Sequence, residues 1–131
     1  MARLIDRTYV ANTTIGLDIQ NVQYGVFAAE DIKKGEIIME CVIPFEWLYK
    51  NTKAMRSYRM GLHDRKVGYL GDYVPLGNSM VVNEGQGNKQ SLFWLADMEN
   101  RIFRGTAVKD IKKDEEILWD YTHQYPPDPL T

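Results

Sequence analysis

Cysteine and histidine are scarce in this chain, and their scarcity excludes two ways of holding a small fold together. There is one cysteine, Cys41, and there are two histidines, His63 and His123, among 131 residues. A single cysteine cannot form an internal disulfide. One thiol and two imidazoles could complete a four-ligand zinc site only with the help of a carboxylate. We therefore expect neither a disulfide nor a structural metal.

Long apolar runs and an excess of basic charge are also lacking. No apolar stretch approaches the roughly 20 residues that a membrane-spanning helix needs. The segment Met1–Asp6 places charged residues where a secretory signal needs an apolar core. The formal net charge of -2 provides no basic field for nucleic acid. We expect an intracellular protein that enters no membrane and binds no nucleic acid.

What remains is the composition of an ordinary folded domain, with 44% hydrophobic and 26% charged residues. A single domain of this length buries roughly two-thirds of the surface of its unfolded chain. Short apolar segments separated by Gly, Asn and Asp turns predict a mostly β domain of several small sheets. The predicted strands are a hairpin of 15–19 and 22–26 that turns at Gln20 and Asn21, followed by 36–43, 69–74, 79–83, 91–96, 101–109 and 116–121.

One segment has a helical period instead. After Pro44, apolar residues recur at roughly helical intervals with basic residues between them, at Trp47, Leu48, Met55, Tyr58 and Leu62. This spacing predicts one helix over 47–62 that stops near Gly61. The last residues, 126–131, contain three prolines and cannot join a strand ladder, so we expect a loose tail.

Two short segments of the chain resemble each other. Asp31–Ile38 reads Asp-Ile-Lys-Lys-Gly-Glu-Ile-Ile, and Asp110–Leu118 reads Asp-Ile-Lys-Lys-Asp-Glu-Glu-Ile-Leu. The likeness is too short to prove a repeat. We interpret it as shared turn chemistry, in which a charged turn leads into a buried strand.

Three scattered groups of residues carry the functional signal. Tyr24–Ala28 reads Tyr-Gly-Val-Phe-Ala, Gly77–Asn78 precedes Asn83, and Asp114–Tyr121 reads Asp-Glu-Glu-Ile-Leu-Trp-Asp-Tyr. In this order and spacing they resemble the motifs of SET-domain methyltransferases. The resemblance covers about 15–125 and is strongest to the small, free-standing SET domains of viruses and some bacteria.

The resemblance implies a fold, a reaction and a cofactor. The fold would be a single SET domain over 1–131 with its core at about 15–125, made of several small sheets with a pseudoknot and one inserted helix. The reaction would be methyl transfer from S-adenosylmethionine to a lysine of a protein substrate. Such a transfer needs in-line positioning, an uncharged amine and exclusion of water. The expected location is the cytoplasm, or the host cell if the source is viral.

The resemblance also implies a set of cofactor-binding residues. They are Gln23, Tyr24, Gly25, Val26, Asn83, Glu84 and Tyr121. The backbone of 23–26 would wrap the methionine part of the cofactor, and Asn83 would meet its amino group or its carboxylate. Gln23 stands where the family has a glycine, and Glu84 stands where it has a histidine, while Asn88 matches the later asparagine of the central motif. From the residue alone, Asn83 could equally be a turn residue after a strand.

Tyr121 is the catalytic residue that the resemblance implies. A phenol, with an unperturbed pKa of about 10, stays neutral at pH 7 and can orient an amine or offer lone pairs to a polarised methyl group. Tyr125, four positions later, and Tyr58, in the predicted helix, are candidate walls of the lysine channel. Packing in the core explains a tyrosine at a strand end or on an amphipathic helix equally well.

Two functions of other classes fit the same residues. A SET-like module that binds the cofactor or a peptide but transfers no methyl group would account for Gln23, for Glu84 and for the central loop, which is one residue shorter than in the family. An unrelated β-rich interaction domain would bind no adenosyl ligand. Small viral SET proteins can pair through their C-terminal strands, so a homodimer is a further option.

Overall fold

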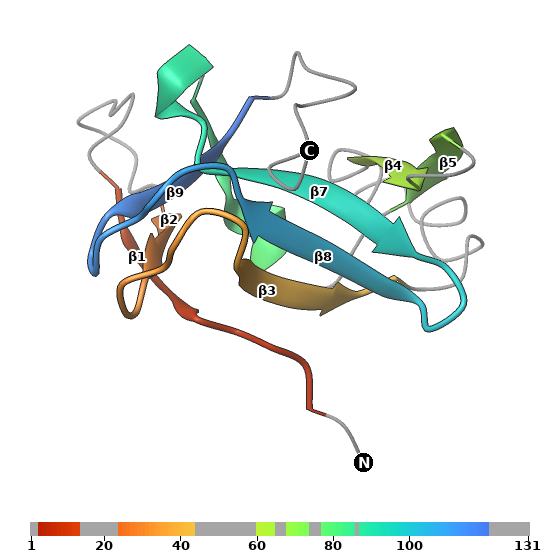
Figure 1. Cartoon of the computed structure of the whole chain (residues 1–131), viewed down its shortest axis with the longest axis horizontal. Helices are drawn as coiled ribbons and strands as arrows, with labels where there is room; N and C mark the ends of the chain where they lie inside the picture. The colour runs from red at the N-terminus through yellow and green to blue at the C-terminus, as the bar shows by residue number, and fades with distance from the viewer. Residues whose placement is uncertain are drawn as a thin grey trace.

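In a computed structural model, the regular elements of the described residues are nearly all β-strands, accompanied by two short 3-10 turns (Figure 1). It describes residues 3–13, 24–43, 60–64, 68–73, 77–85 and 87–120. These residues confirm the predicted mostly β architecture of several small sheets. Their elements are β1 (Thr8–Asn12), β2 (Tyr24–Ala28), β3 (Ile37–Val42), β4 (Met60–Asp64), β5 (Gly68–Tyr73), the 3-10 turn η2 (Asn78–Val81), β6 (Asn83–Glu84), the 3-10 turn η3 (Gly87–Lys89), β7 (Leu92–Asp97), β8 (Ile102–Ala107) and β9 (Glu116–Trp119).

The described strands form three small sheets. A four-stranded sheet has the order β1-β2-β9-β6, a three-stranded sheet has the order β3-β8-β7, and β4 pairs with β5. All of these pairs are antiparallel except β6 with β9. Figure 1 shows β1, β2 and β9 at one end of the molecule, with the β3-β8-β7 sheet extending away from them. Because β2 pairs with β9 and β3 with β8, the fold depends on pairing between the first and last thirds of the chain.

The two similar charged segments lie side by side and bond to each other reciprocally. The backbone N–H of Ile32 donates to the carbonyl oxygen of Ile111 at 2.8 Å, and the N–H of Ile111 donates to the carbonyl oxygen of Ile32 at 2.7 Å. The flanking strands continue this approximate two-fold relation, since β2 and β3 around one segment pair with β9 and β8 around the other. The likeness read in the sequence is therefore a likeness of structure.

In each of these segments, a backbone N–H also donates to the aspartate of the other segment. Asp31 Oδ1 accepts a hydrogen bond from the backbone N–H of Lys113, and Asp110 Oδ1 accepts one from the N–H of Lys34, both at 2.9 Å. Aspartate carboxylates commonly satisfy turn N–H groups in this way. The sequence indicates shared turn chemistry, and the aspartate hydrogen bonds of these turns are made between the two segments rather than within each.

The hydrophobic core includes stacked aromatic rings from β7 and β8. Trp94 stacks on Phe103 with ring centroids 4.5 Å apart. Gly105 lies opposite Trp94 across the two strands, and a methyl group on it would come within 2.8 Å of the indole ring. Glycine is therefore required for Trp94 to lie across β8. The most deeply buried apolar residues are Val26, Ala28, Ile32, Ile38, Met39, Leu92, Phe103, Ala107, Ile111 and Ile117.

The predicted helix over 47–62 is wrong at its C-terminal end. Met60–Asp64 is strand β4, which pairs antiparallel with β5. Met60 and Leu62 alternate along the chain, and this fits the two-residue period of a strand as well as the last turn of a helix. Pairing with β5 decides between the two. Residues 47–59 lie outside the described residues, so the inserted helix stays a prediction there.

The predicted strand over 79–83 is also wrong for most of its length. Asn78–Val81 form the 3-10 turn η2, and the strand starts only at Asn83. The turn is entered at Gly77, whose φ of 137° is a conformation that glycine adopts without strain. A methyl group on Gly77 would also lie 3.0 Å from the sulfur of Cys41 in β3. The glycine lets the chain turn tightly against β3, which delays the strand.

The N-terminal partner of β2 lies earlier in the chain than the sequence predicts. β2 pairs with β1 along its whole length, with Asn12 opposite Tyr24. The predicted partner, 15–19, lies outside the described residues, as do Gln20 and Asn21 of its turn. β1 escapes prediction because its residues are exposed or only partly buried and show no alternation of apolar and polar side chains. The pseudoknot and the loose tail over 126–131 stay predictions.

Candidate functional site

Asn83 lies where β6 joins the four-stranded sheet. β6 runs parallel to β9, with Asn83 opposite Leu118 and Glu84 opposite Trp119. The N–H of Gly85 extends the pairing by donating to the carbonyl oxygen of Trp119 at 3.1 Å. This pairing brings the central motif of the sequence against the last one.

The side-chain amide of Asn83 is held by two acceptors. Its Nδ2 donates to the carbonyl oxygen of Tyr24 at 3.1 Å and to Oε2 of Glu116 at 2.9 Å. A carbonyl oxygen and an ionised carboxylate can only accept, so the nitrogen of the amide must face them and the orientation of the amide is determined. The Asn83 side chain consequently turns its oxygen, a hydrogen-bond acceptor, away from Glu116.

Gly25 is the residue that permits this close approach. A methyl group on Gly25 would lie 2.5 Å from Oε2 of Glu116 and 3.1 Å from Nδ2 of Asn83. The first distance is well inside the contact distance of a carbon and an oxygen, so any larger residue would push the carboxylate out of place. The glycine of the first motif therefore makes room for the side chains of the other two.

Glu116, the first residue of β9, uses both oxygens of its carboxylate. Oε2 accepts from Asn83, and Oε1 accepts a short hydrogen bond from the hydroxyl of Thr13. Thr13 directly follows β1 and is only 2% exposed. Gly25 of β2 also lies against the carboxylate. The carboxylate, which belongs to β9, therefore meets residues of β2 and β6 and the residue that follows β1. Such charge-assisted hydrogen bonds are the stronger ones in proteins.

We call Thr13, Gly25, Asn83 and Glu116 the cluster. The remaining predicted cofactor residues near this cluster differ in exposure. The side chains of Tyr24, at 56% exposure, and Glu84 face solvent beside Asn83. Val26 is fully buried in the hydrophobic core, opposite Ile117. A ligand at this site could therefore meet Val26 only through its backbone.

Asn78 and Asn88, from the same central motif, make other contacts. Asn78 donates from Nδ2 to Oγ1 of Thr8 at 3.0 Å and to Oδ2 of Asp6 at 3.3 Å, which ties η2 to the N-terminal segment. Asn88 is exposed in η3, and its carbonyl oxygen accepts from Nζ of Lys109 at 3.0 Å. The side chain of Asn78 thus contacts the start of β1 and does not take part in the contacts of Asn83.

Several predicted site residues lie outside the described part of the chain. Asp120, which directly precedes the predicted catalytic tyrosine, is described and is 2% exposed at the end of β9. The catalytic and channel roles stay predictions for the residues outside the description, namely Gln23, Tyr58, Tyr121 and Tyr125.

The pattern of the sequence does not reveal two members of the cluster. Glu116 belongs to the last motif, but a carboxylate after a charged turn is usually solvated, and only the pairing of β9 with β2 and β6 turns it toward Asn83. Thr13 has no signal of its own, since its partner lies 103 residues later in the chain.

Among the described residues, neither a metal site nor an activated thiol accompanies this cluster. No group of three or more His, Cys, Asp or Glu side chains is placed there to hold a metal ion. Burial raises the pKa of the Cys41 thiol above its ordinary value, so the thiol stays neutral. The same residues contain no helix that is long and apolar enough to cross a membrane.

Comparison with known proteins shows the family of the chain. The family model described as SET domain matches residues 23–122. The chain belongs to the SET-domain family. Within this SET domain, the match includes the first, central and last motifs, but it begins after β1 and Thr13 and ends before Tyr125.

This SET domain has a relative in Chaetomium thermophilum. The histone-lysine N-methyltransferase EZH2 of Chaetomium thermophilum is 33% identical over 118 residues, which is 79% of this chain and 8% of that protein. The chain therefore spans less than a tenth of the length of this relative.

Solved structures share the fold at lower identity. A candidate histone methyltransferase of Plasmodium falciparum has a TM-score of 0.62 at 23% identity over 92% of this chain and 97% of that chain. The methyltransferase domain of human PR domain-containing protein 2 has a TM-score of 0.58 at 21% identity over 95% and 83%. The Chaetomium thermophilum Polycomb Repressive Complex 2, autoinhibited and bound to S-adenosylmethionine, has a TM-score of 0.59 at 21% identity over 95% and 16%. These structures confirm that the three small sheets are a SET fold.

Proposed function

We propose that this SET domain is a protein-lysine methyltransferase that uses S-adenosylmethionine. The observation that carries the proposal is the meeting of Tyr24–Gly25, Asn83 and Glu116 at one point of the four-stranded sheet. These residues come from three separate motifs of the sequence. The names of the relatives support the reaction class, and a related complex bound to S-adenosylmethionine supports the cofactor.

The residues present fit the amino acid part of this cofactor. A protonated amino group only donates hydrogen bonds, and Asn83 turns an acceptor oxygen away from its own two partners. The carboxylate of Glu116, 2.9 Å behind the amide, adds a negative charge that favours a cation at this position. We therefore assign Asn83 to the amino group of the cofactor, where the sequence leaves the amino group and the carboxylate open.

The bound cofactor would supply an electrophilic methyl group on a sulfonium. The chain itself has to hold a neutral lysine amine in line with that group and to exclude water. We assign the orientation of the amine to the phenol of Tyr121 and the walls of the channel to Tyr58 and Tyr125. Tyr121 directly follows Asp120, the last described residue, which is 2% exposed.

Calorimetric titration with S-adenosylmethionine and S-adenosylhomocysteine tests the cofactor. We expect saturable binding near one ligand per chain. Core histones with methyl-labelled cofactor then test the transfer, and Tyr121→Phe should abolish turnover while leaving cofactor affinity within about threefold, because the phenol acts on the amine. Unchanged turnover in this variant would contradict the assignment.

The same experiments separate the rival functions. Cofactor binding without label transfer to any protein would identify a SET-like binding module. Absence of adenosyl-ligand binding at millimolar concentration would identify a β-rich interaction domain. In a chain that binds the cofactor as proposed, Asn83→Ala should remove cofactor binding, because it deletes the hydrogen-bond acceptor assigned to the amino group.

A further inference from the structure

The strand β1 precedes the residues that match the SET-domain model, yet it belongs to the sheet that carries the site. The match begins at residue 23. β1 pairs with β2 from Thr8 opposite Ala28 to Asn12 opposite Tyr24, so it lies directly beside the first motif. In Figure 1 the strand runs along the outer side of β2.

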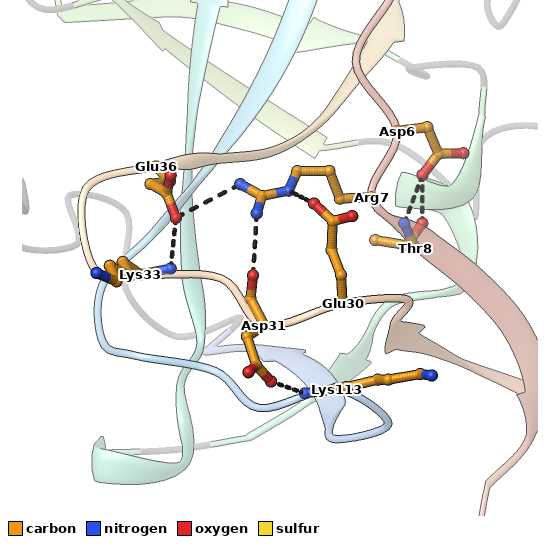
Figure 2. A network of polar contacts seen from close by, with 8 residues as sticks. All are labelled: Asp6, Arg7, Thr8, Glu30, Asp31, Lys33, Glu36 and Lys113. Carbon is orange, nitrogen blue, oxygen red and sulfur yellow. Dashed lines mark hydrogen bonds and ion pairs between the residues drawn. The ribbon is translucent and has the colours of Figure 1, made fainter.

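One end of this strand is fixed by a charged network (Figure 2). The guanidinium of Arg7 donates to Oε1 of Glu30 at 2.6 Å and to the carbonyl oxygen of Asp31 at 3.0 Å, and it lies 3.6 Å from the carboxylate of Glu36. The backbone of Arg7 also bonds to Ile38 at 3.0 Å. These contacts join the start of β1 to the turn between β2 and β3 and to β3 itself. They lie at the end of β1 opposite Ala28, whereas Asn83 contacts Tyr24 at the other end.

The other end of the strand contacts the site itself. The hydroxyl of Thr13 donates to Oε1 of Glu116, whose Oε2 accepts from Nδ2 of Asn83. The hydroxyl thereby holds one carboxylate oxygen, which leaves the other directed at the amide. If the carboxylate turned, the amide of Asn83 would lose a charged partner and could rotate its NH2 group toward the ligand.

We propose that Thr13 and Glu116 are positioning residues that keep the Asn83 oxygen directed at the amino group of the adenosyl cofactor, and that β1 is therefore part of the cofactor site. This inference rests on the proposed function. It assigns to a residue outside the family match, Thr13, an effect on ligand affinity that its position on an N-terminal strand does not suggest.

Two ligands distinguish positioning from a general structural role. S-adenosylhomocysteine carries the amino acid part that Asn83 would bind. 5′-Methylthioadenosine has the same nucleoside and thioether but lacks that part. A residue that only stabilises the fold changes the affinity for both ligands alike, whereas a residue that positions Asn83 changes the affinity for the first alone.

Calorimetric titration of the full chain with both ligands is the test. Thr13→Val and Glu116→Gln should each weaken S-adenosylhomocysteine by about tenfold, the effect of losing one charge-assisted hydrogen bond, and leave 5′-methylthioadenosine within about twofold. Glu115→Gln is the matched control, because it removes the neighbouring carboxylate, which is exposed, and should leave both affinities unchanged.

Two further variants complete the design. Thr13→Ser keeps the hydroxyl and should restore most of the affinity that Thr13→Val loses. Arg7→Gln breaks the other anchor of β1 and should lower the unfolding temperature without changing either affinity. Equal losses for the two ligands, or wild-type affinity in both Thr13→Val and Glu116→Gln, would overturn the inference while the cofactor assignment stands. No binding of S-adenosylhomocysteine to the wild-type chain would overturn both.

Discussion

The two charged turns, Asp31–Glu36 and Asp110–Glu115, share a backbone but differ in what they hold. In both, the N–H of the final glutamate donates to the carbonyl oxygen of the first lysine at 3.0 Å, that is, Glu36 to Lys33 and Glu115 to Lys112. We call them the first and second turn. The bonds between the two turns are reciprocal, so the differences between the turns lie in their side chains.

The clearest difference is the residue that follows each turn. Ile37 follows the first turn and lies opposite Thr106, whereas Glu116 follows the second turn and lies opposite Phe27. The first turn is clamped by Arg7 of the N-terminal segment. The second turn leads into the carboxylate that holds Asn83. The two turns therefore share a backbone conformation but lead into different residues. The first leads into the apolar Ile37, and the second leads into the charged Glu116 of the candidate site.

The largest effect on stability is expected at the bridge between Ile32 and Ile111, which joins the two turns. Ile32→Ala and Ile111→Ala each remove a side chain that is 1% exposed, and each should lower the free energy of unfolding by about 2–5 kcal/mol through lost burial and a residual cavity. Urea denaturation measures both. Val42→Ala, at a position 45% exposed, is the control and should change stability by less than about 0.5 kcal/mol. A large effect at one isoleucine with none at the other would show that the turns are not equivalent.

Substitutions at the fourth residue after Asp31 and after Asp110 should have smaller effects on stability, and the two effects should differ. Gly35 has φ of 90° and Asp114 has φ of 70°. Gly35→Ala should destabilise the protein by about 1 kcal/mol, because alanine is strained at positive φ. Asp114→Gly relieves the same strain but loses the hydrogen bond from the Tyr9 hydroxyl, 2.7 Å long, so its net effect should stay within about 0.5 kcal/mol. Thermal unfolding of the pair checks this, and a stabilising Gly35→Ala would contradict it.

The smallest expected effect is a pH dependence in the first turn. The pKa of Glu36 lies below its ordinary value of 4.5, because its carboxylate accepts the N–H of Lys33 and lies near Arg7. A lowered pKa in the folded state means that the ionised group stabilises the fold above pH 4.5, and that this contribution disappears as the pH falls through the folded-state pKa.

The variant Glu36→Gln tests this sign. Its unfolding temperature should lie slightly below that of the wild-type protein at pH 7, and the gap should close as the pH falls below about 4.5. The group is exposed, so the gap should also shrink in high salt. A gap that widens in acid would mean that the carboxylate destabilises the folded protein.

Much of the described fold follows from local pattern, and the exceptions have physical causes. The segments 36–43, 91–96 and 101–109 are strands within a few residues of their predicted limits, because each has a largely apolar core bounded by charged or polar turns. β1 has no such core, and β4 fits both helical and strand periods. Local pattern fails for these two because pairing with the next strand, β2 for β1 and β5 for β4, decides their structure.

The candidate site divides in the same way. Gly25 and Asn83 are predictable from their motifs, and the described structure brings them together. Thr13 and the role of Glu116 are not predictable, because a hydrogen bond requires its two groups within about 3 Å and in a favourable direction. That geometry arises only when β1, β2, β6 and β9 are in register.

Residue type and short-range spacing are enough to predict the mostly β class, the order of the three motifs, the family and the likeness of the two turns. Three features require the folded chain: which oxygen of Glu116 meets Asn83, the contact of Thr13 from outside the family match with that carboxylate, and the bonds between the two turns. Each of these is a contact between segments far apart in the chain, and strand register, which no local pattern specifies, sets them.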